Sequence, residues 1–196
     1  EPTTRLRAAT PAFAAPGLAG GNHIGFYRQW PAAGMLGKIP LHCTVFGPWE
    51  KNLLQPEEVD GLTTSYHYYQ TIDSPENKAF LERWSKRFGA DHPEIGTLAV
   101  CSYNAVNIWK QAVEKAGDLE HDKVVAALET PVSFDGPGGK MTVHTTSHHA
   151  TMSTVVAEIR DGQFQIIGKS ENVEPLDTSA VCDLIANPDQ STQYQP

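Results

Sequence analysis

The sequence has 196 residues, of which 40% are hydrophobic and 19% are charged, a composition typical of globular proteins and far from that of disordered chains. Its formal net charge of −8, with 15 scattered basic residues, argues against nucleic acid or an anionic membrane surface as a partner. No apolar run approaches the roughly 20 residues that a membrane-spanning helix needs.

The three cysteines, Cys43, Cys101 and Cys182, lie far apart and include no CxxC pair. This spacing indicates neither a disulfide framework nor a zinc site, so we expect buried, unreactive thiols with at most one disulfide. The glycine pair Gly20-Gly21 lacks the third glycine of the dinucleotide-binding motif. No cofactor is therefore predicted.

The first sixty residues predict a βαβ unit. Thr3–Ala9 has the character of the end of a helix, and Ala12–Leu18 that of a short strand of small residues. The glycine turn Ala19–His23 opens a helix predicted from Ile24 to about Gly34, and Ile39–Phe46 is the next strand. At these separations the two strands are expected to lie side by side and parallel, joined by a right-handed crossover.

A tyrosine-rich strand followed by a well-marked helix occupies residues 60–89. Leu62–Tyr69 is rich in aromatic and β-branched residues, as strands are. Ser74 is placed to cap the next helix, Pro75 suits its first turn, and Gly89 is predicted to end it in a left-handed conformation. Such a unit presents side chains to a ligand cleft in α/β proteins, although tyrosines in a strand are also ordinary core residues.

A long helix is predicted from about Ile95 to Ala116, ended by Gly117. Its first half is apolar almost all round, which predicts that this half is buried. Asp122 is expected to cap a short helix over Lys123–Glu129.

Short strands are predicted from residue 130 onward, with Asp161-Gly162 as a hairpin turn. Ser170–Pro196 is polar and is predicted to be a tail, with one helical turn over Ala180–Ala186. The strands expected before the tail are Val132–Phe134, Lys140–His144, Thr154–Arg160 and Gln163–Gly168.

Several segments occur in an order that is characteristic of one family. They are GLAGGNHIGFYRQWPAAGM, IPLHCTVFG, DGLTTSYHYYQTIDSPENKAFLERWSKRFG, YNAVNIWKQAVEKAG, DKVVAAL, FDGPGGKMTVHTTSHH and AEIRDGQFQI. Together they resemble the later half of the type I periplasmic solute-binding proteins of ABC importers. The branch is that of receptors for branched-chain amino acids, urea and short-chain amides, and the resemblance extends from about Pro11 to Ile167.

The resemblance implies an α/β, two-lobed fold with parallel sheets flanked by helices, of which only the later half is represented. It implies a periplasmic protein without catalytic activity, which binds a small solute and delivers it to a membrane permease. Residues 1–60 would form part of the second lobe, 61–130 part of the first lobe, 131–169 a return to the second lobe, and 170–196 a C-terminal tail. The remainder of the first lobe would be missing from this chain or supplied by another, so we expect the chain not to be a self-sufficient domain.

The resemblance also implies a set of ligand-binding positions. No Asp or Glu stands at 44–46, where amino-acid receptors carry an acidic residue for the ammonium group, and the nearest is Glu50. We therefore expect an uncharged or anionic planar solute, such as an amide, a urea-like molecule or an aromatic acid. The implied positions are Gly20, Gly21 and Asn22, Thr44, Val45 and Phe46, Tyr68 and Tyr69, and Tyr103, of which Tyr103 is equally explained as a core residue.

Two other functions stay open at this point. The same fold could serve a cytoplasmic sensor of amide-type ligands that regulates a partner protein. A metal-binding or hydrolytic protein could use His144, His148 and His149, but adjacent strand residues point to opposite faces, and no HExxH or GxSxG motif accompanies them.

Overall fold

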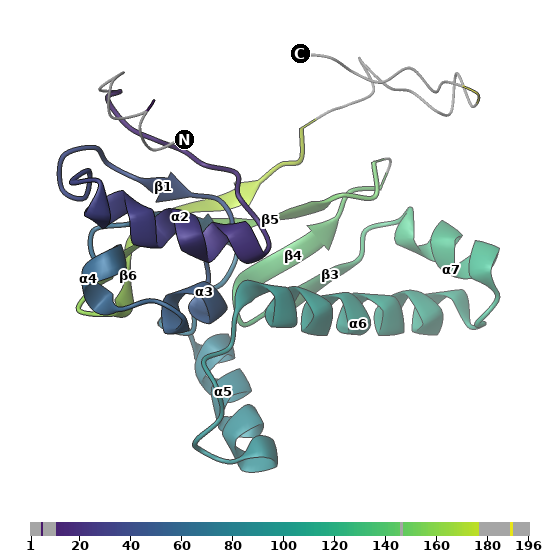
Figure 1. Ribbon diagram of the computed structural model, residues 1–196. Helices are drawn as coiled ribbons and strands as arrows, with labels where there is room; N and C mark the ends of the chain where they lie inside the picture. Colours follow the sequence, from purple (N-terminus) through teal and green to yellow (C-terminus); the bar gives the residue numbers. More distant parts are fainter. Residues whose placement is uncertain (1–4, 6–10, 146, 177–188, 190–196) are drawn as a thin grey trace.

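The computed structural model describes residues 5, 11–145, 147–176 and 189 (Figure 1). Helices and the two short strands β1 and β2 are interspersed up to α7, and the described elements after α7 are all strands. In chain order they are α2 (Gly21–Ala32), β1 (His42–Cys43), α3 (Pro48–Asn52), α4 (Pro56–Val59), β2 (Thr63–Tyr66), α5 (Pro75–Phe88), α6 (Thr97–Ala116), α7 (His121–Leu128), β3 (Ser133–Gly136), β4 (Gly139–Val143), β5 (Ala150–Arg160) and β6 (Gln163–Val173).

The strands form one mixed sheet in the order β1-β2-β5-β4-β3, with β6 also paired to β5. Among the labelled strands of the described residues, the pair β1–β2 is parallel and the other pairs are antiparallel. The long strand β5 pairs with β4 through Ala150 and Thr151 and with β2 through Val155–Glu158. The fold is therefore α/β, as predicted, but the sheet is mixed and mainly antiparallel where parallel sheets were expected. The long strand β5 lies in the middle of the sheet and connects its two halves (Figure 1).

The predicted βαβ unit is present, with a smaller first strand than expected. Ala14 forms a single parallel bridge with Leu41, in which Ala14 N donates to Pro40 O at 2.9 Å and His42 N donates to Ala14 O at 2.9 Å. The parallel arrangement is confirmed, but a full strand over Ala12–Leu18 is wrong. The chain there is rich in alanine, glycine and proline, which give a strand little to pack.

The strand and the helix predicted within residues 60–89 are both present, as β2 and α5. Ser74 caps α5, because its Oγ accepts a hydrogen bond from Asn77 N at 3.1 Å. Gly89 has φ 94° and ψ 161°, so its φ is positive, but its ψ lies outside the predicted left-handed helical region. Gly117, with φ 65° and ψ 15°, does adopt that conformation after α6.

Helix α6 differs from its prediction in burial. Its inward face, which includes Val100, Asn104 and Ile108, is buried. Its outward face exposes Leu98 by 77% and Val106 by 65%, so the predicted burial of the whole first half is wrong for the described chain. The cap of α7 also differs, because Glu120 accepts from Lys123 N in place of Asp122.

The C-terminal strands are longer than predicted. The hairpin turn is confirmed, with φ 51° at Asp161 and 70° at Gly162, as a two-residue turn of the primed type requires. β6 continues to Val173, so the polar tail begins later than residue 170. Of the helical segment predicted over Thr3–Ala9 only Arg5 is described, as a helical residue, and the segment Ala180–Ala186 lies outside the described residues.

The packed side chains fall into two regions. The largest core joins α2, β1, β2, β5 and β6 around Tyr27, Trp30 and Phe164. Smaller clusters lie among α5, α6, α7, β3 and β4. Figure 1 shows α6 and α7 beside β3 and β4, whereas α2 and α4 lie at the other end of the sheet. The candidate site is built on the first region.

Candidate functional site

The first wall of the candidate site is the start of helix α2. Gly20 is its N-cap, with φ 76° and ψ −162°, a conformation open to glycine and strained for other residues. No side chain caps this end, and no acidic residue occupies its first turn. Gly20 and Gly21 are exposed, so backbone N–H groups and the positive end of the helix dipole face outward.

The second wall is the segment that follows β1. Thr44 and Val45 are exposed, whereas the ring of Phe46 is fully buried beneath them. The chain then enters α3, where Gly47 N donates to Oε2 of Glu50 at 2.8 Å. This bond engages the only carboxylate close to the segment in sequence.

Three buried polar side chains connect the two walls. His23 Nε2 lies 2.7 Å from the Tyr27 hydroxyl, and that hydroxyl donates to Cys43 Sγ at 2.9 Å. Phe46 packs edge-on against Tyr27, with ring centroids 4.8 Å apart, and its centroid is 6.2 Å from that of His23. Burial lowers the pKa of His23 and raises the pKa of Cys43 to about 12, so both groups are neutral at pH 7.

Strand β2 supports the second wall from behind. Thr64 Oγ1 donates to Phe46 O at 2.9 Å. Tyr66 is half-buried, and its pKa is raised, first by burial and then by the negative charge of Glu50, while a hydrogen bond with the backbone of Phe46 opposes the shift. The Tyr66 hydroxyl therefore lies beside the same backbone segment and stays protonated at neutral pH.

The predicted tyrosines divide between the two packed regions. Tyr68 and Tyr69 are only 1% and 2% exposed. The Tyr68 hydroxyl donates to Asn77 Oδ1 at 2.9 Å, in the cluster with Phe80, whereas Tyr69 packs on Phe164 in the main core. Both pKa values are raised, chiefly by burial. Their role as ligand contacts stays a prediction.

Tyr103 lies on α6, away from the two walls. It is half-buried, with its ring centroid 5.1 Å from that of Phe80 and 5.8 Å from that of Phe134, and Arg83 donates to its hydroxyl at 3.4 Å. These contacts place it in the α5–α6 cluster. The structure thus brings together the Gly20–Asn22 and Thr44–Phe46 segments, and it separates both from Tyr68 and Tyr103.

Sequence reasoning missed four residues at these walls. His23, Tyr27 and Cys43 form the buried connection, and Trp49 is a large exposed side chain at the start of α3. A signal for the first two was available, because residues four apart lie on one face of a helix. An isolated tryptophan directly after a Gly-Pro turn was also visible in the sequence.

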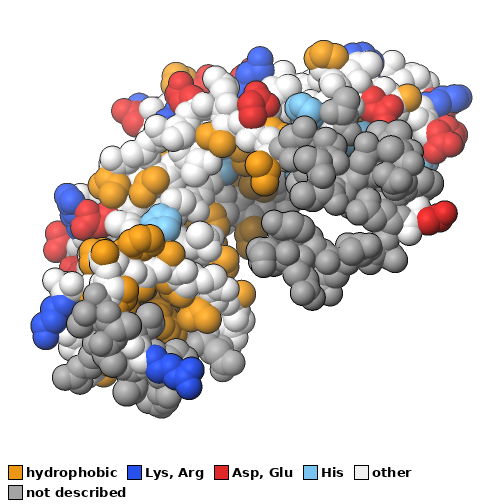
Figure 2. Space-filling model, turned by 90° about the horizontal axis from the view of Figure 1, so that it is seen from above, with side chains coloured by type: hydrophobic (Ala, Val, Ile, Leu, Met, Phe, Trp, Pro, Cys, Tyr) orange, Lys and Arg blue, Asp and Glu red, His pale blue; other side chains and the backbone are white. Residues whose placement is uncertain are grey.

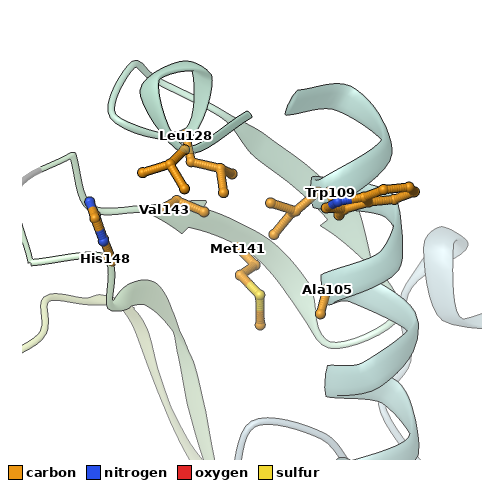
Figure 3. Close-up of a pocket in the computed structure, with 8 residues that line it drawn as sticks. Ala105, Trp109, Leu128, Met141, Val143 and His148 are labelled. Carbon is orange, nitrogen blue, oxygen red and sulfur yellow. The ribbon is translucent and has the colours of Figure 1, made fainter. Parts of the chain in front are cut away.

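An apolar cavity of about 270 Å³ lies between α6, α7 and β4 (Figure 3). Its lining is hydrophobic apart from His148, whose Nε2 is 3.2 Å from Glu129 Oε1. The lining residues are Ala105, Ile108, Trp109, Val125, Leu128, Met141, Val143 and His148. With one polar side chain at its margin, this cavity has little with which to orient a polar solute.

The histidine cluster does not form a metal centre in the described chain. Ser147 Oγ lies 3.0 Å from His144 Nδ1, while His148 pairs with Glu129. Among the described residues, no three His, Cys, Asp or Glu side chains are grouped so that they could hold a metal ion. The metal-binding alternative therefore has no support from the ligand geometry of the described residues.

The surface charges are mixed. Figure 2 shows Lys and Arg side chains interspersed with Asp and Glu on one face of the molecule, without a continuous basic area. Within the described ranges, no helix has both the length and the apolarity required to cross a bilayer.

Comparison with known proteins identifies relatives of this fold. A leucine-binding protein, LivK, from Thermotoga maritima MSB8 aligns with a TM-score of 0.74 and 19% identity over 87% of this chain and 47% of that protein. A solute-binding protein of an ABC transporter from Rhodopseudomonas palustris HaA2, solved with p-hydroxybenzoic acid, aligns with a TM-score of 0.73 and 25% identity over 86% of this chain and 48% of that one.

A curated relative, named limonene hydroxylase, from Geobacillus stearothermophilus is 28% identical over 131 residues, which are 65% of this chain and 23% of that protein. The chain thus spans about half the length of the two solved structures and about a quarter of this relative. Residues 3–181 match the family described as periplasmic binding protein domain. Since that match covers most of the sequence and the fold agrees, the chain belongs to the type I periplasmic binding proteins.

Proposed function

We propose that the full-length protein is the periplasmic solute-binding component of an ABC importer, and that this chain supplies two walls of its solute site. The observation that carries the proposal is the uncapped start of α2 at Gly20–Asn22, connected through buried side chains to the exposed segment Thr44–Val45. Binding a solute between such walls needs backbone donors and a shaped surface, and it needs no catalytic group.

The proposed solute is a small planar molecule that is uncharged or anionic, with aromatic carboxylic acids as the favoured class over amides and urea-like molecules. Free N–H groups at a helix start favour a carboxylate. Residues 44–46 offer no carboxylate for an ammonium group, and Glu50 is already bonded by Gly47 N. Trp49, exposed directly after this segment, offers a flat surface for an aromatic ring. A related protein of 25% identity was solved with p-hydroxybenzoic acid.

The lobe assignment is part of the proposal. Residues 1–60 and 131–169 would belong mainly to the second lobe and residues 61–130 to the first, with the solute between them and a membrane permease as the partner. The first lobe would then contribute three tyrosines to the solute site, namely Tyr68, Tyr69 and Tyr103. Because Tyr68 and Tyr69 are buried in packed clusters, they would contact a solute only after the side chains around them had moved.

The remainder of the first lobe is proposed to cover the outward face of α6. Leu98, Val106 and Trp109 expose 77%, 65% and 51% of their area, and the apolar cavity adjoins Trp109. A helix that is apolar on opposite faces is normally buried on both. The solved relatives are about twice as long as this chain, so they contain enough additional polypeptide for such a covering.

Calorimetry on the full-length protein tests the solute class. We expect 4-hydroxybenzoate to bind more tightly than urea, acetamide or leucine. Thr44→Glu should weaken 4-hydroxybenzoate binding at least tenfold, because it places a carboxylate at the anion-binding wall, whereas the uncharged Thr44→Gln should change it by less than threefold. Tight leucine binding that is insensitive to Thr44→Glu would contradict both the solute class and the site. Recovery of the full-length protein from the cytoplasm, and not from the periplasm, would favour the ligand-sensor alternative.

A further inference from the structure

We infer that Tyr27 is a positioning residue for the proposed solute site, and that the buried chain His23–Tyr27–Cys43 holds the two walls at the separation that the solute requires. This inference rests on the proposed function for its ligand. It assigns a role to three residues that do not reach the solute themselves.

The placement of the three residues motivates the assignment. His23 directly follows the Gly20–Asn22 wall, and Cys43 directly precedes the Thr44–Phe46 wall. Tyr27 stands between them, with its hydroxyl 2.7 Å from His23 Nε2 and 2.9 Å from Cys43 Sγ. These two hydrogen bonds between side chains add to the backbone bridge between Ala14 and Leu41.

The direction of the bonds makes Tyr27 the essential member. A tyrosine hydroxyl has one proton, and here it is donated to the Cys43 sulfur. The oxygen must therefore accept from His23, which fixes the N–H on Nε2 of that ring. Removal of one hydroxyl consequently leaves two buried groups without their partner, one on each wall.

The surroundings prevent water from replacing the lost bonds. His23, Tyr27 and Cys43 are each at most 2% exposed, and Phe46 seals them with an edge-on contact to Tyr27. An unpaired polar group in such a buried site is costly, so the arrangement in which every group has a hydrogen-bond partner is strongly favoured. The distance between the walls is therefore set by this chain, and only weakly by the exposed residues that a solute would touch.

The binding test uses the Tyr27→Phe variant of the full-length protein with 4-hydroxybenzoate as the probe. The variant keeps the ring that packs on Phe46 and removes only the hydroxyl. We expect the dissociation constant to rise about tenfold, because the two walls of the variant must become ordered when the solute binds, and this ordering reduces the net free energy of binding. An unchanged dissociation constant, within twofold, would overturn the inference.

Two control variants separate positioning from loss of stability. Ser65→Ala removes a hydrogen bond of 3.1 Å between Ser65 Oγ and His42 Nε2 on the neighbouring strands. Val124→Ala removes buried methyl groups in the distant α6–α7 cluster. Both should leave the dissociation constant within twofold of the wild-type value, even where the melting temperature falls as far as it does in Tyr27→Phe. A tenfold loss of affinity in Val124→Ala would show that stability alone explains the effect.

A second measurement needs no ligand. Amide hydrogen exchange of the full-length Tyr27→Phe protein should accelerate at both residues 20–23 and residues 43–46, and remain unchanged in α7. Acceleration at only one wall, or uniformly over the protein, would contradict a link between the walls. If the wild-type protein fails to bind 4-hydroxybenzoate, the proposed solute class is wrong, and the exchange pattern still decides whether Tyr27 couples the two walls.

Discussion

Lys51 Nζ lies 2.8 Å from Oε2 of Glu94, and this ion pair joins α3 to the loop that precedes α6. The side chains are only 9% and 19% exposed, so the pair is largely removed from solvent. Lys51 also donates to Gly162 O at 3.0 Å and lies over the Phe164 ring, 5.2 Å from its centroid. One ammonium group therefore connects three segments that are distant in sequence.

Glu94→Gln should lower the free energy of unfolding by about 1–3 kcal/mol, because it leaves a buried ammonium group without its counter-charge. The matched control is Glu114→Gln, which breaks the exposed pair with Lys110 and should cost less than about 0.5 kcal/mol. Urea denaturation of the three proteins measures the difference. Equal effects of the two substitutions would show that burial of the Lys51 pair contributes nothing.

Gly138→Ala should destabilise the fold by about 2–4 kcal/mol. A Cβ atom at this position would stand 2.7 Å from Nε2 and 2.9 Å from the carbonyl oxygen of His67. Both distances are too short, and the backbone carbonyl cannot move away as easily as the end of a flexible side chain can. Gly25→Ala is the control, since a Cβ there meets nothing within 4 Å and alanine favours the interior of α2. Thermal unfolding should therefore show a lower melting temperature for Gly138→Ala, and an equal or higher one for Gly25→Ala.

The stability of the protein should fall as the pH is lowered from about 6.5. Burial lowers the pKa of His67 below its ordinary value of 6.5, while its Nδ1 lies 2.9 Å from Ser153 O. Below pH 6.5 the unfolded chain consequently binds more protons than the folded one, and unfolding is favoured until His67 is protonated in the fold as well. The slope due to one histidine is at most about 1.4 kcal/mol per pH unit.

Urea denaturation between pH 5.5 and 7.5 measures this dependence, and the His67→Gln variant supplies the comparison. Although that variant is less stable at neutral pH, its stability should vary less with pH than that of the wild type. Identical pH profiles would show that His67 does not carry the linkage.

Trp109→Ser should distinguish the 196-residue chain from the full-length protein. In the chain alone Trp109 is half-exposed, so its loss should lower the free energy of unfolding by only about 1 kcal/mol. If the remainder of the first lobe covers this face, the same substitution in the full-length protein should cost about 2–4 kcal/mol. Lys110→Ser, a neighbouring exposed position, should be neutral in both. Small, equal effects of Trp109→Ser would contradict the proposed covering.

The sequence predicted most elements whose signals are local. The cap at Ser74, the turn at Asp161-Gly162 and the parallel arrangement of Ala14 and Leu41 depend on neighbouring residues or on short connections, and each is confirmed. Helices α3 and α4 were not predicted, because five and four residues are too few to show a helical period. Their starts at Pro48 and Pro56, where proline suits the first turn, were the only local indication.

The candidate site was harder to predict because it depends on distant contacts. Tyr68 and Tyr69 are adjacent in sequence, so their side chains point to opposite sides and enter different cores. The apolar pattern in the first half of α6 predicted that this half is buried. The sequence of the helix alone does not indicate which other part of the polypeptide covers each of its faces. The link from His23 to Cys43 was not predicted because its members come from different elements, and only the fold brings them within hydrogen-bonding distance.

Strand β5 joins the two ends of the sheet. Its first residues pair with β4, its later residues pair with β2, and its pairing with β6 is irregular between Met152 and Thr154. Ser153, at this irregularity, binds His67 through its carbonyl oxygen. Such an irregularity leaves a residue out of the ladder and bends the strand locally. The hydrogen bond between His67 Nδ1 and Ser153 O therefore ties the segment after β2 to a point where the β5–β6 ladder is interrupted.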